Sequence, residues 1–156
     1  DTIFTRISKN EVLIFPPMLN SNFENHLNSI YFFEEGQSEP KNIKENLVSV
    51  LKDNGYSIEY IKCGADNKIM QEREQWTDGA NSFALSPGKI IGYDCNKHTL
   101  MELKKAGYRI VKSDDYLKEY VKYNNSNEKL IITIKGSELL RGRGGPRCLT
   151  LPIFRL

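Results

Sequence analysis

The sixteen residues from Arg141 to Leu156 carry the side chains with the clearest potential for chemistry. They include four arginines, three glycines and one cysteine, Cys148. A cysteine attacks as its thiolate, and nearby cationic groups favour that form over the thiol. Cys148 directly follows Arg147, and the glycines before it allow tight backbone turns close to a ligand. The segment therefore predicts a nucleophilic site on a Gly/Arg loop.

The residues after Cys148 indicate how such a loop would be anchored. Leu149, Leu151, Ile153 and Phe154 give a mostly apolar pattern. This pattern predicts a strand that packs into a core and holds the loop in place.

Composition limits the classes of protein that fit. The chain of 156 residues fits one domain, with 39% hydrophobic and 27% charged residues, as in globular proteins. The net charge of +2 gives no overall electrostatic case for nucleic-acid binding. Three widely spaced cysteines and two histidines suit neither a disulfide framework nor a zinc site, so we expect no metal and a cytoplasmic location. No apolar stretch approaches the roughly 18 residues of a membrane span.

Strands and helices are predicted to alternate along the chain, separated by polar connections at 20–41, 64–75 and 113–129. Two helices are predicted, one from residue 42 to the Gly55 cap and one between a capping Asn96 and Gly107. A third helical segment is indicated at 116–121. The predicted strands are 3–7, 12–15, 56–61, 82–85, 89–93, 108–112 and 130–134, with 30–33 as a strand or a loop anchor.

The two halves of the chain show the same order of elements. Residues 51–58 align with 103–110 at a constant offset of 52, with Leu, Lys, Gly, Tyr and Ile in common. Repeats of this kind normally stack with further copies, so we predict two repeat units, about 1–65 and 76–156. The chain begins with what reads as the middle of a strand, and we expect it to be part of a longer protein. In the alternative interpretation, any two helix ends share this pattern.

Five motifs occur in a fixed order and carry a family resemblance. They are 76–81 (WTDGAN), 86–88 (SPG), 92–96 (GYDCN) with Thr99, 136–139 (GSEL) and 142–148 (GRGGPRC). Together they resemble the C-terminal part of bacterial-type arginine deiminases, which belong to the guanidino-modifying (pentein) superfamily. One departure is Cys95, where the family usually has arginine.

The resemblance implies a five-bladed α/β propeller, of which this chain would form about two strand–helix modules. It also implies hydrolysis of L-arginine to L-citrulline and ammonia without metal or cofactor. Cys148 matches the nucleophile that attacks the guanidinium carbon, and a histidine-activated water then hydrolyses the thiouronium adduct. The expected partners are L-arginine, the N-terminal part of the same protein and further copies in a homo-oligomer.

Other site residues follow from the resemblance alone. Asp1 matches a carboxylate that holds the guanidinium, and the catalytic histidine would precede it by two residues. Asn81 and Gly142 match positions that contact the amino-acid end of the substrate. Arg143 matches a loop arginine that gates the site.

Several of these side chains also have structural interpretations. Asn81 can bond its own loop, Asp78 can form a turn, and Trp76 can belong to the core. Cys63, at the end of a strand, is interpreted as a small buried residue. His26 and His98 match no catalytic position and are predicted to lie on the surface.

Three alternative functions stay open at this stage. One is another guanidino substrate, such as agmatine or a methylated arginine, and a second is amidino transfer to an amine. The third belongs to a different class: a non-enzymatic module whose 141–145 loop binds RNA or an acidic partner. The neutral charge balance and the lack of interleaved aromatic residues disfavour that module.

Overall fold

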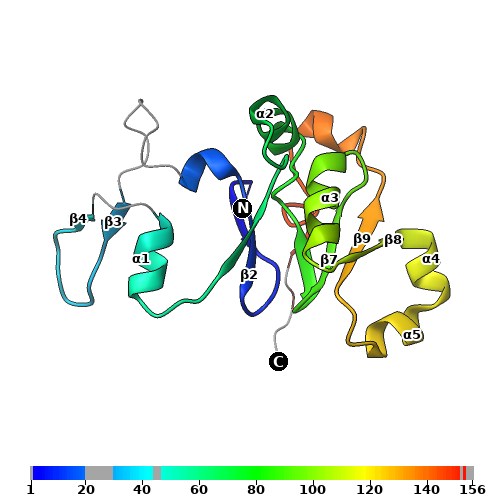
Figure 1. Cartoon of the computed structure of the whole chain (residues 1–156), viewed down its shortest axis with the longest axis horizontal. Helices are drawn as coiled ribbons and strands as arrows, with labels where there is room; N and C mark the ends of the chain where they lie inside the picture. Colours follow the sequence, from blue (N-terminus) through cyan, green and yellow to red (C-terminus); the bar gives the residue numbers. More distant parts are fainter. Residues whose placement is uncertain (1, 20–29, 44–46, 152, 154–156) are drawn as a thin grey trace.

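The computed structural model describes residues 2–19, 30–43, 47–151 and 153 (Figure 1). Over these residues the chain is mixed α/β, and its strands form three separate sheets. The predicted α/β class is therefore confirmed, while the closed propeller stays a prediction. In the described part of the chain, no helix has the length and apolar character needed to cross a membrane.

The first sheet has three strands in the order β1-β2-β5. A tight turn joins β1 (Phe4–Arg6) to β2 (Glu11–Ile14), which pair antiparallel, and β5 (Glu59–Lys62) pairs parallel to β2. Every residue of β2 is buried. The apolar run at 12–15 predicts this for Val12, Leu13 and Ile14, whereas Glu11 is a buried carboxylate that the run does not predict.

The second sheet has four strands in the order β6-β7-β9-β8. The hairpin of β6 (Phe83–Ser86) and β7 (Lys89–Tyr93) is antiparallel, whereas β9 (Leu130–Ile134) pairs parallel with both β7 and β8 (Arg109–Lys112). Helix α3 (Lys97–Lys105) connects β7 to β8. The short helices α4 (Ser113–Lys118) and α5 (Tyr120–Asn125) lie at the β8 end of the molecule (Figure 1).

The remaining elements lie between and beyond these sheets. The 3-10 helix η1 (Pro16–Leu19) follows β2, and β3 (Ile30–Phe32) and β4 (Lys41–Ile43) form a two-stranded antiparallel sheet. This sheet and α1 (Leu47–Asp53) lie at the end of the molecule away from α4 and α5 (Figure 1). Helix α2 (Lys68–Trp76) lies between the two larger sheets in the sequence.

One hydrophobic core joins the three-stranded and four-stranded sheets. The backbone N–H of Gly88 donates to the Ile7 carbonyl at 2.9 Å and links the two hairpin turns. The buried Glu11 carboxylate accepts from the Tyr108 hydroxyl at 3.0 Å and from Lys129 Nζ at 2.6 Å. The residues of this core are Ile7, Leu13, Ile61, Cys63, Ala80, Ile90, Leu100, Leu103, Tyr108 and Ile131.

The residues shared at the offset of 52 form the same helix end twice. Gly55 and Gly107 have φ of 81° and 89°, and their N–H groups donate to Lys52 and Lys104. The tyrosines that follow differ in surroundings, because Tyr56 is 53% exposed and Tyr108 only 1%. The sheets differ as well. In the first sheet, β5, the strand after α1, pairs with β2, whereas in the second sheet β8, the strand after α3, pairs with β9 and not with β7. The aligned residues share a helix end, and the two repeat units, about 1–65 and 76–156, stay a prediction.

Four expectations for individual segments were wrong. A helix was expected from residue 42, but residues 41–43 form strand β4 and α1 is Leu47–Asp53. The polar connection 64–75 contains helix α2. Asn96 occupies the N-cap position of α3 but makes no capping side-chain bond. The residues after Cys148 form no strand in the described part of the chain, and the side chains of Leu149, Leu151 and Ile153 are exposed. They do not anchor the loop; the contacts described below do.

Candidate active site

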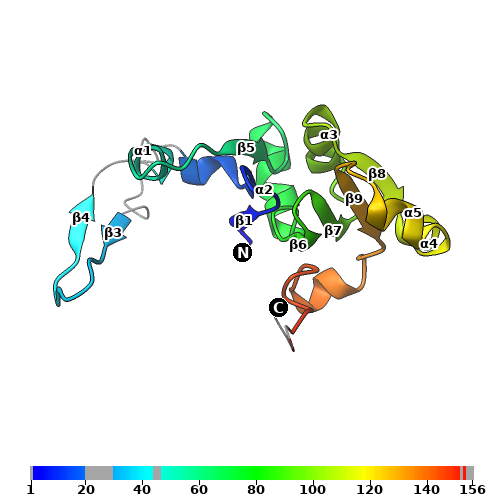
Figure 2. The same cartoon turned by 90° about the horizontal axis from the view of Figure 1, so that it is seen from below.

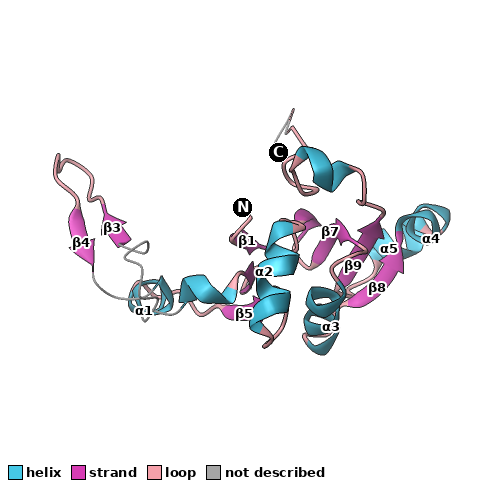
Figure 3. Cartoon of the chain, turned by 90° about the horizontal axis from the view of Figure 1, so that it is seen from above, coloured by secondary structure: helices cyan, strands magenta, loops and turns pink. Residues whose placement is uncertain are grey.

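The Gly/Arg loop lies on the side of the four-stranded sheet opposite α3 (Figures 2 and 3). It leaves β9, passes through the 3-10 helix η2 (Leu139–Gly142) and continues to Cys148. It meets Trp76 at the end of α2 and the segment 77–82, which links α2 to β6. The site is therefore built where two connections meet.

Asn81 contacts Cys148 directly. Its side-chain Nδ2 donates to Cys148 Sγ at 3.0 Å, and its Oδ1 accepts from the backbone N–H of Arg147 at 3.0 Å. Asn81 is fully buried, whereas Cys148 is exposed. One buried amide thus holds both the cysteine and the residue before it.

Gly145 packs against this amide. A β-carbon at Gly145 would lie 2.5 Å from Cβ, Cγ and Oδ1 of Asn81. Only glycine allows the backbone to approach the amide this closely. The Gly-Gly pair in the loop is therefore explained in part by the packing of Asn81.

Gly144 is held by hydrogen bonds through both its backbone N–H and its carbonyl group. Its N–H donates to Asp78 Oδ2 at 3.2 Å, and its carbonyl accepts from the Tyr93 hydroxyl at 2.9 Å. Burial raises the pKa of Tyr93, and the neighbouring Asp78 carboxylate raises it further, so this hydroxyl stays protonated and donates. Gly136 lies against the Tyr93 ring, where a β-carbon would come within 2.3 Å.

Arg143 lies over Trp76. The centre of its guanidinium is 4.1 Å from the ring centroid of Trp76. Arg143 is one of the non-glycine residues with positive φ, at 58°, and Asp78 is another, at 57°. Trp76 is 63% exposed, so its interpretation as a core residue was wrong.

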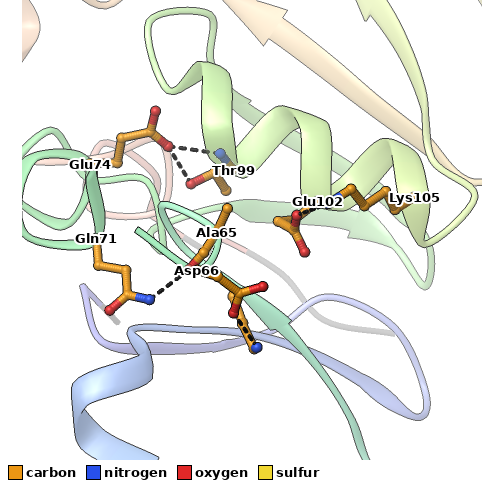
Figure 4. A network of polar contacts seen from close by, with 8 residues as sticks. Ala65, Asp66, Gln71, Glu74, Thr99, Glu102 and Lys105 are labelled. Carbon is orange, nitrogen blue, oxygen red and sulfur yellow. Dashed lines mark hydrogen bonds and ion pairs between the residues drawn. The ribbon is translucent and has the colours of Figure 1, made fainter. Parts of the chain in front are cut away.

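Helix α3 is tied to α2, which precedes the segment that carries these contacts; the bonds between Glu74 and Thr99 are drawn in Figure 4. The buried Glu74 carboxylate, on α2, accepts from the backbone N–H groups of His98 and Thr99, both at 2.8 Å, and from the Thr99 hydroxyl at 2.7 Å. This carboxylate caps α3 in place of Asn96. The Asn96 side chain instead accepts from the Thr77 hydroxyl at 2.5 Å and donates to the Thr77 carbonyl at 2.9 Å.

Cys148 lies on the wall of an open cleft of about 820 Å³. The turn between β1 and β2, the β6–β7 hairpin and the Gly/Arg loop form its walls. None of the described lining residues is acidic, whereas Arg6, Lys9 and Arg147 are basic. The lining residues are Arg6, Ile7, Ser8, Lys9, Ser82, Phe83, Ala84, Leu85, Ser86, Pro87, Arg147, Cys148 and Thr150.

The structure brings together only some of the predicted site residues. Cys148 and Asn81 are in contact, while Gly142 and Arg143 lie at the end of η2 and are exposed. Asp1 lies outside the described residues. Tyr93 and Gly145 were not predicted as parts of the site, although the Gly-Gly step and the GYD motif drew attention to their segments.

The remaining cysteines and the described histidine lie elsewhere. Cys63 is fully buried in the core, as predicted, and burial raises its pKa to about 12. Cys95 is exposed, and burial of part of its thiol raises its pKa. His98 is half-buried and is not among the residues that line the cleft, and His26 lies outside the described residues. No cluster of three or more His, Cys, Asp or Glu side chains suited to a metal ion occurs among the described residues.

Known proteins resemble this chain over its whole length. The family model described as "Arginine deiminase" matches residues 1–155. Arginine deiminase from Mycoplasma capricolum is 33% identical over 156 residues, which cover 99% of this chain and 32% of that protein. The Listeria welshimeri arginine deiminase is 33% identical over 160 residues, or 99% of this chain and 33% of the relative. The chain therefore spans about a third of the length of the curated relatives it matches.

Proposed function

Since the chain belongs to the arginine deiminase family, we propose that it supplies the nucleophile, Cys148, for hydrolysis of L-arginine to L-citrulline and ammonia. The observation that carries the proposal is the hydrogen bond from Asn81 to an exposed sulfur on an open cleft. A held but accessible sulfur is what attack on a substrate carbon requires.

The proposed reaction has two covalent steps. The Cys148 thiolate forms a bond to the guanidinium carbon, one terminal nitrogen takes up a proton, and the bond from the carbon to that nitrogen breaks as ammonia leaves. Water then adds to the same carbon and the C–S bond breaks, which gives citrulline, the Cys148 thiol and one released proton that balances the proton taken up in the first step. Neither step oxidises or reduces the substrate.

The charges in the cleft suggest that the two ends of the substrate are bound by different groups. Arg6, Lys9 and Arg147 suit the α-carboxylate of arginine, whereas a guanidinium is best oriented by carboxylates through paired hydrogen bonds. The carboxylates for the guanidinium would then come from Asp1 and from a further part of an arginine deiminase fold. We propose that Asn81 and Gly142 contact the amino-acid end of the substrate, and that Arg143 moves off Trp76 to gate the cleft.

A comparison of arginine with agmatine tests whether the enzyme prefers arginine over other guanidino substrates. Agmatine lacks the α-carboxylate, so an enzyme that uses the basic side of the cleft for this group should prefer arginine. Equal kcat/KM for arginine and agmatine would contradict the proposed role of the basic residues. The proposed role of Cys148 would be unaffected.

The direct test is citrulline production by a full arginine deiminase that contains this chain. Cys148→Ser should abolish turnover, and Cys95→Ser, which alters another exposed cysteine, should not. Mass spectrometry of the arginine-treated enzyme should find the amidino adduct on the peptide that holds Cys148. The chain alone is expected to be inactive. Full activity of the Cys148→Ser enzyme would refute the proposal.

A further inference from the structure

We infer that Asn81 is a positioning residue for the nucleophile: its amide fixes Sγ of Cys148 and directs an N–H donor at the thiolate. The inference rests on the proposed function only in taking Cys148 as the nucleophile. It goes beyond the predicted contact of Asn81 with the substrate, because the amide would orient the sulfur before any substrate binds.

The orientation of the Asn81 amide follows from its other partner. The backbone N–H of Arg147 can only donate, so the atom that faces it at 3.0 Å must be the amide oxygen. The amide nitrogen then faces Sγ at 3.0 Å. Since that nitrogen can only donate, the sulfur is the acceptor, a role in which a thiolate is stronger than a thiol.

Packing keeps the amide in this orientation. Asn81 is fully buried, and the backbone of Gly145 packs closely against its side chain. Its backbone N–H donates to the Asp78 carbonyl at 3.0 Å, and the Asp78 side chain holds Gly144. One short turn therefore supports both the donor and the loop that carries the acceptor.

The charged and titratable groups around Sγ come from three directions. Arg147 precedes Cys148 on the loop. Arg6 and Lys9 line the same cleft from the β1–β2 turn, where the Arg6 guanidinium donates to the backbone carbonyls of Ser8 and Lys9. Behind the loop, Asp78 and Tyr93 hold Gly144. The Asn81 amide adds a directed neutral donor to these groups.

The test is the pH profile of Cys148 alkylation by iodoacetamide, read by mass spectrometry of each cysteine peptide in the 156-residue chain without arginine. Asn81→Asp keeps an oxygen for the Arg147 N–H but replaces the donor at sulfur with a carboxylate oxygen. We expect the Cys148 profile to move to higher pH and its rate at neutral pH to fall about tenfold. Asn81→Ala should give a smaller shift in the same direction.

Two cysteines in the same sample act as controls. Exposed Cys95 should keep its rate, and fully buried Cys63 should stay protected unless the variant unfolds. A merely structural Asn81 would leave the Asn81→Ala profile at its wild-type position, because alanine removes the donor at sulfur without adding a charge. Such a result, with Cys63 still protected, would overturn the inference.

A second measurement needs no change at Asn81. In the wild-type chain, the side-chain NH₂ resonances of Asn81 should shift with pH in step with the ionisation of Cys148, as followed by alkylation. The shift should vanish in Cys148→Ala. A flat titration in the wild type would contradict the inference even if both Asn81 variants unfolded. Because neither measurement involves turnover, its outcome is independent of whether the enzyme hydrolyses arginine.

Discussion

A β-carbon on Gly145 would lie within 2.5 Å of three side-chain atoms of Asn81. Few real β-carbons approach other atoms so closely, so Gly145→Ala must displace either the loop or the amide. We expect a loss of about 1–3 kcal/mol in the free energy of unfolding, as for other overpacked sites. Urea unfolding measures this change.

Gly142→Ala is the matched control for that prediction. Gly142 lies in the same loop, but a β-carbon there would meet nothing within 4 Å. Its free energy of unfolding should stay within about 0.5 kcal/mol of the wild type. If the two substitutions cost the same, the packing of Gly145 on Asn81 would not explain the glycine.

Loss of the Tyr93 hydroxyl should loosen the same loop. Tyr93→Phe removes the buried bond to the Gly144 carbonyl and leaves that carbonyl without the hydroxyl, at a cost of about 1–3 kcal/mol. Tyr56→Phe, at an exposed tyrosine, should cost nothing measurable. Thermal unfolding of both variants checks the prediction, and equal melting temperatures would contradict it.

Glu74 offers a test of how α3 supports the site. Glu74→Gln removes the charge at the helix N-terminus and leaves a single oxygen for three donors, so we expect a loss of about 2 kcal/mol. Glu72→Gln, an exposed position on the same helix, should have little effect. Comparison of the two variants in urea isolates the cap, and a neutral Glu74→Gln would show that the cap adds no stability.

Much of the fold was predictable where apolar pattern and glycine position agree. The strands of both larger sheets and the left-handed caps at Gly55 and Gly107 were predicted. Helix α2 was not, because its buried residues are Gln71 and Glu74, and a helix that buries polar side chains shows no apolar period. The available signal in the sequence was Asn67, a residue type that favours the N-cap position; its side chain accepts from the Met70 N–H at 3.1 Å.

The site was predictable in its residues but not in its contacts. Asn81 and Cys148 are 67 positions apart in the chain, and no local spacing predicts a bond between their side chains. The cap from Glu74 to Thr99 likewise crosses 25 positions and replaces the local choice, Asn96. Such pairings depend on how two connections meet above a sheet, which only the folded chain defines.

Alkaline pH should weaken the fold through Cys63. Burial raises its pKa from 9.0 to about 12, so between these values the unfolded chain loses a proton that the folded chain keeps. Stability is therefore fully present below about pH 9 and falls as the pH rises, by up to about 1.4 kcal/mol per pH unit from this group. Cys63→Ala should flatten the decline measured by urea unfolding at pH 8 to 11. A decline as steep as that of the wild type would contradict the assignment to Cys63.

The contact of Arg143 with Trp76 gives a spectroscopic signal, because Trp76 is the only tryptophan in the chain. Arg143→Gly removes the guanidinium from the ring, 4.1 Å away, and should change the intensity and wavelength of tryptophan emission. Stability should change little, since losing about 0.5–1 kcal/mol of cation–π attraction is offset by relief of the positive φ of 58°, a conformation that glycine adopts freely. Arg141→Ala, which removes an exposed partner of Glu138 in the same loop, should leave the emission unchanged. If Arg143→Gly also leaves it unchanged, the guanidinium does not rest on the indole in solution, and the proposed gating motion away from Trp76 loses its starting point.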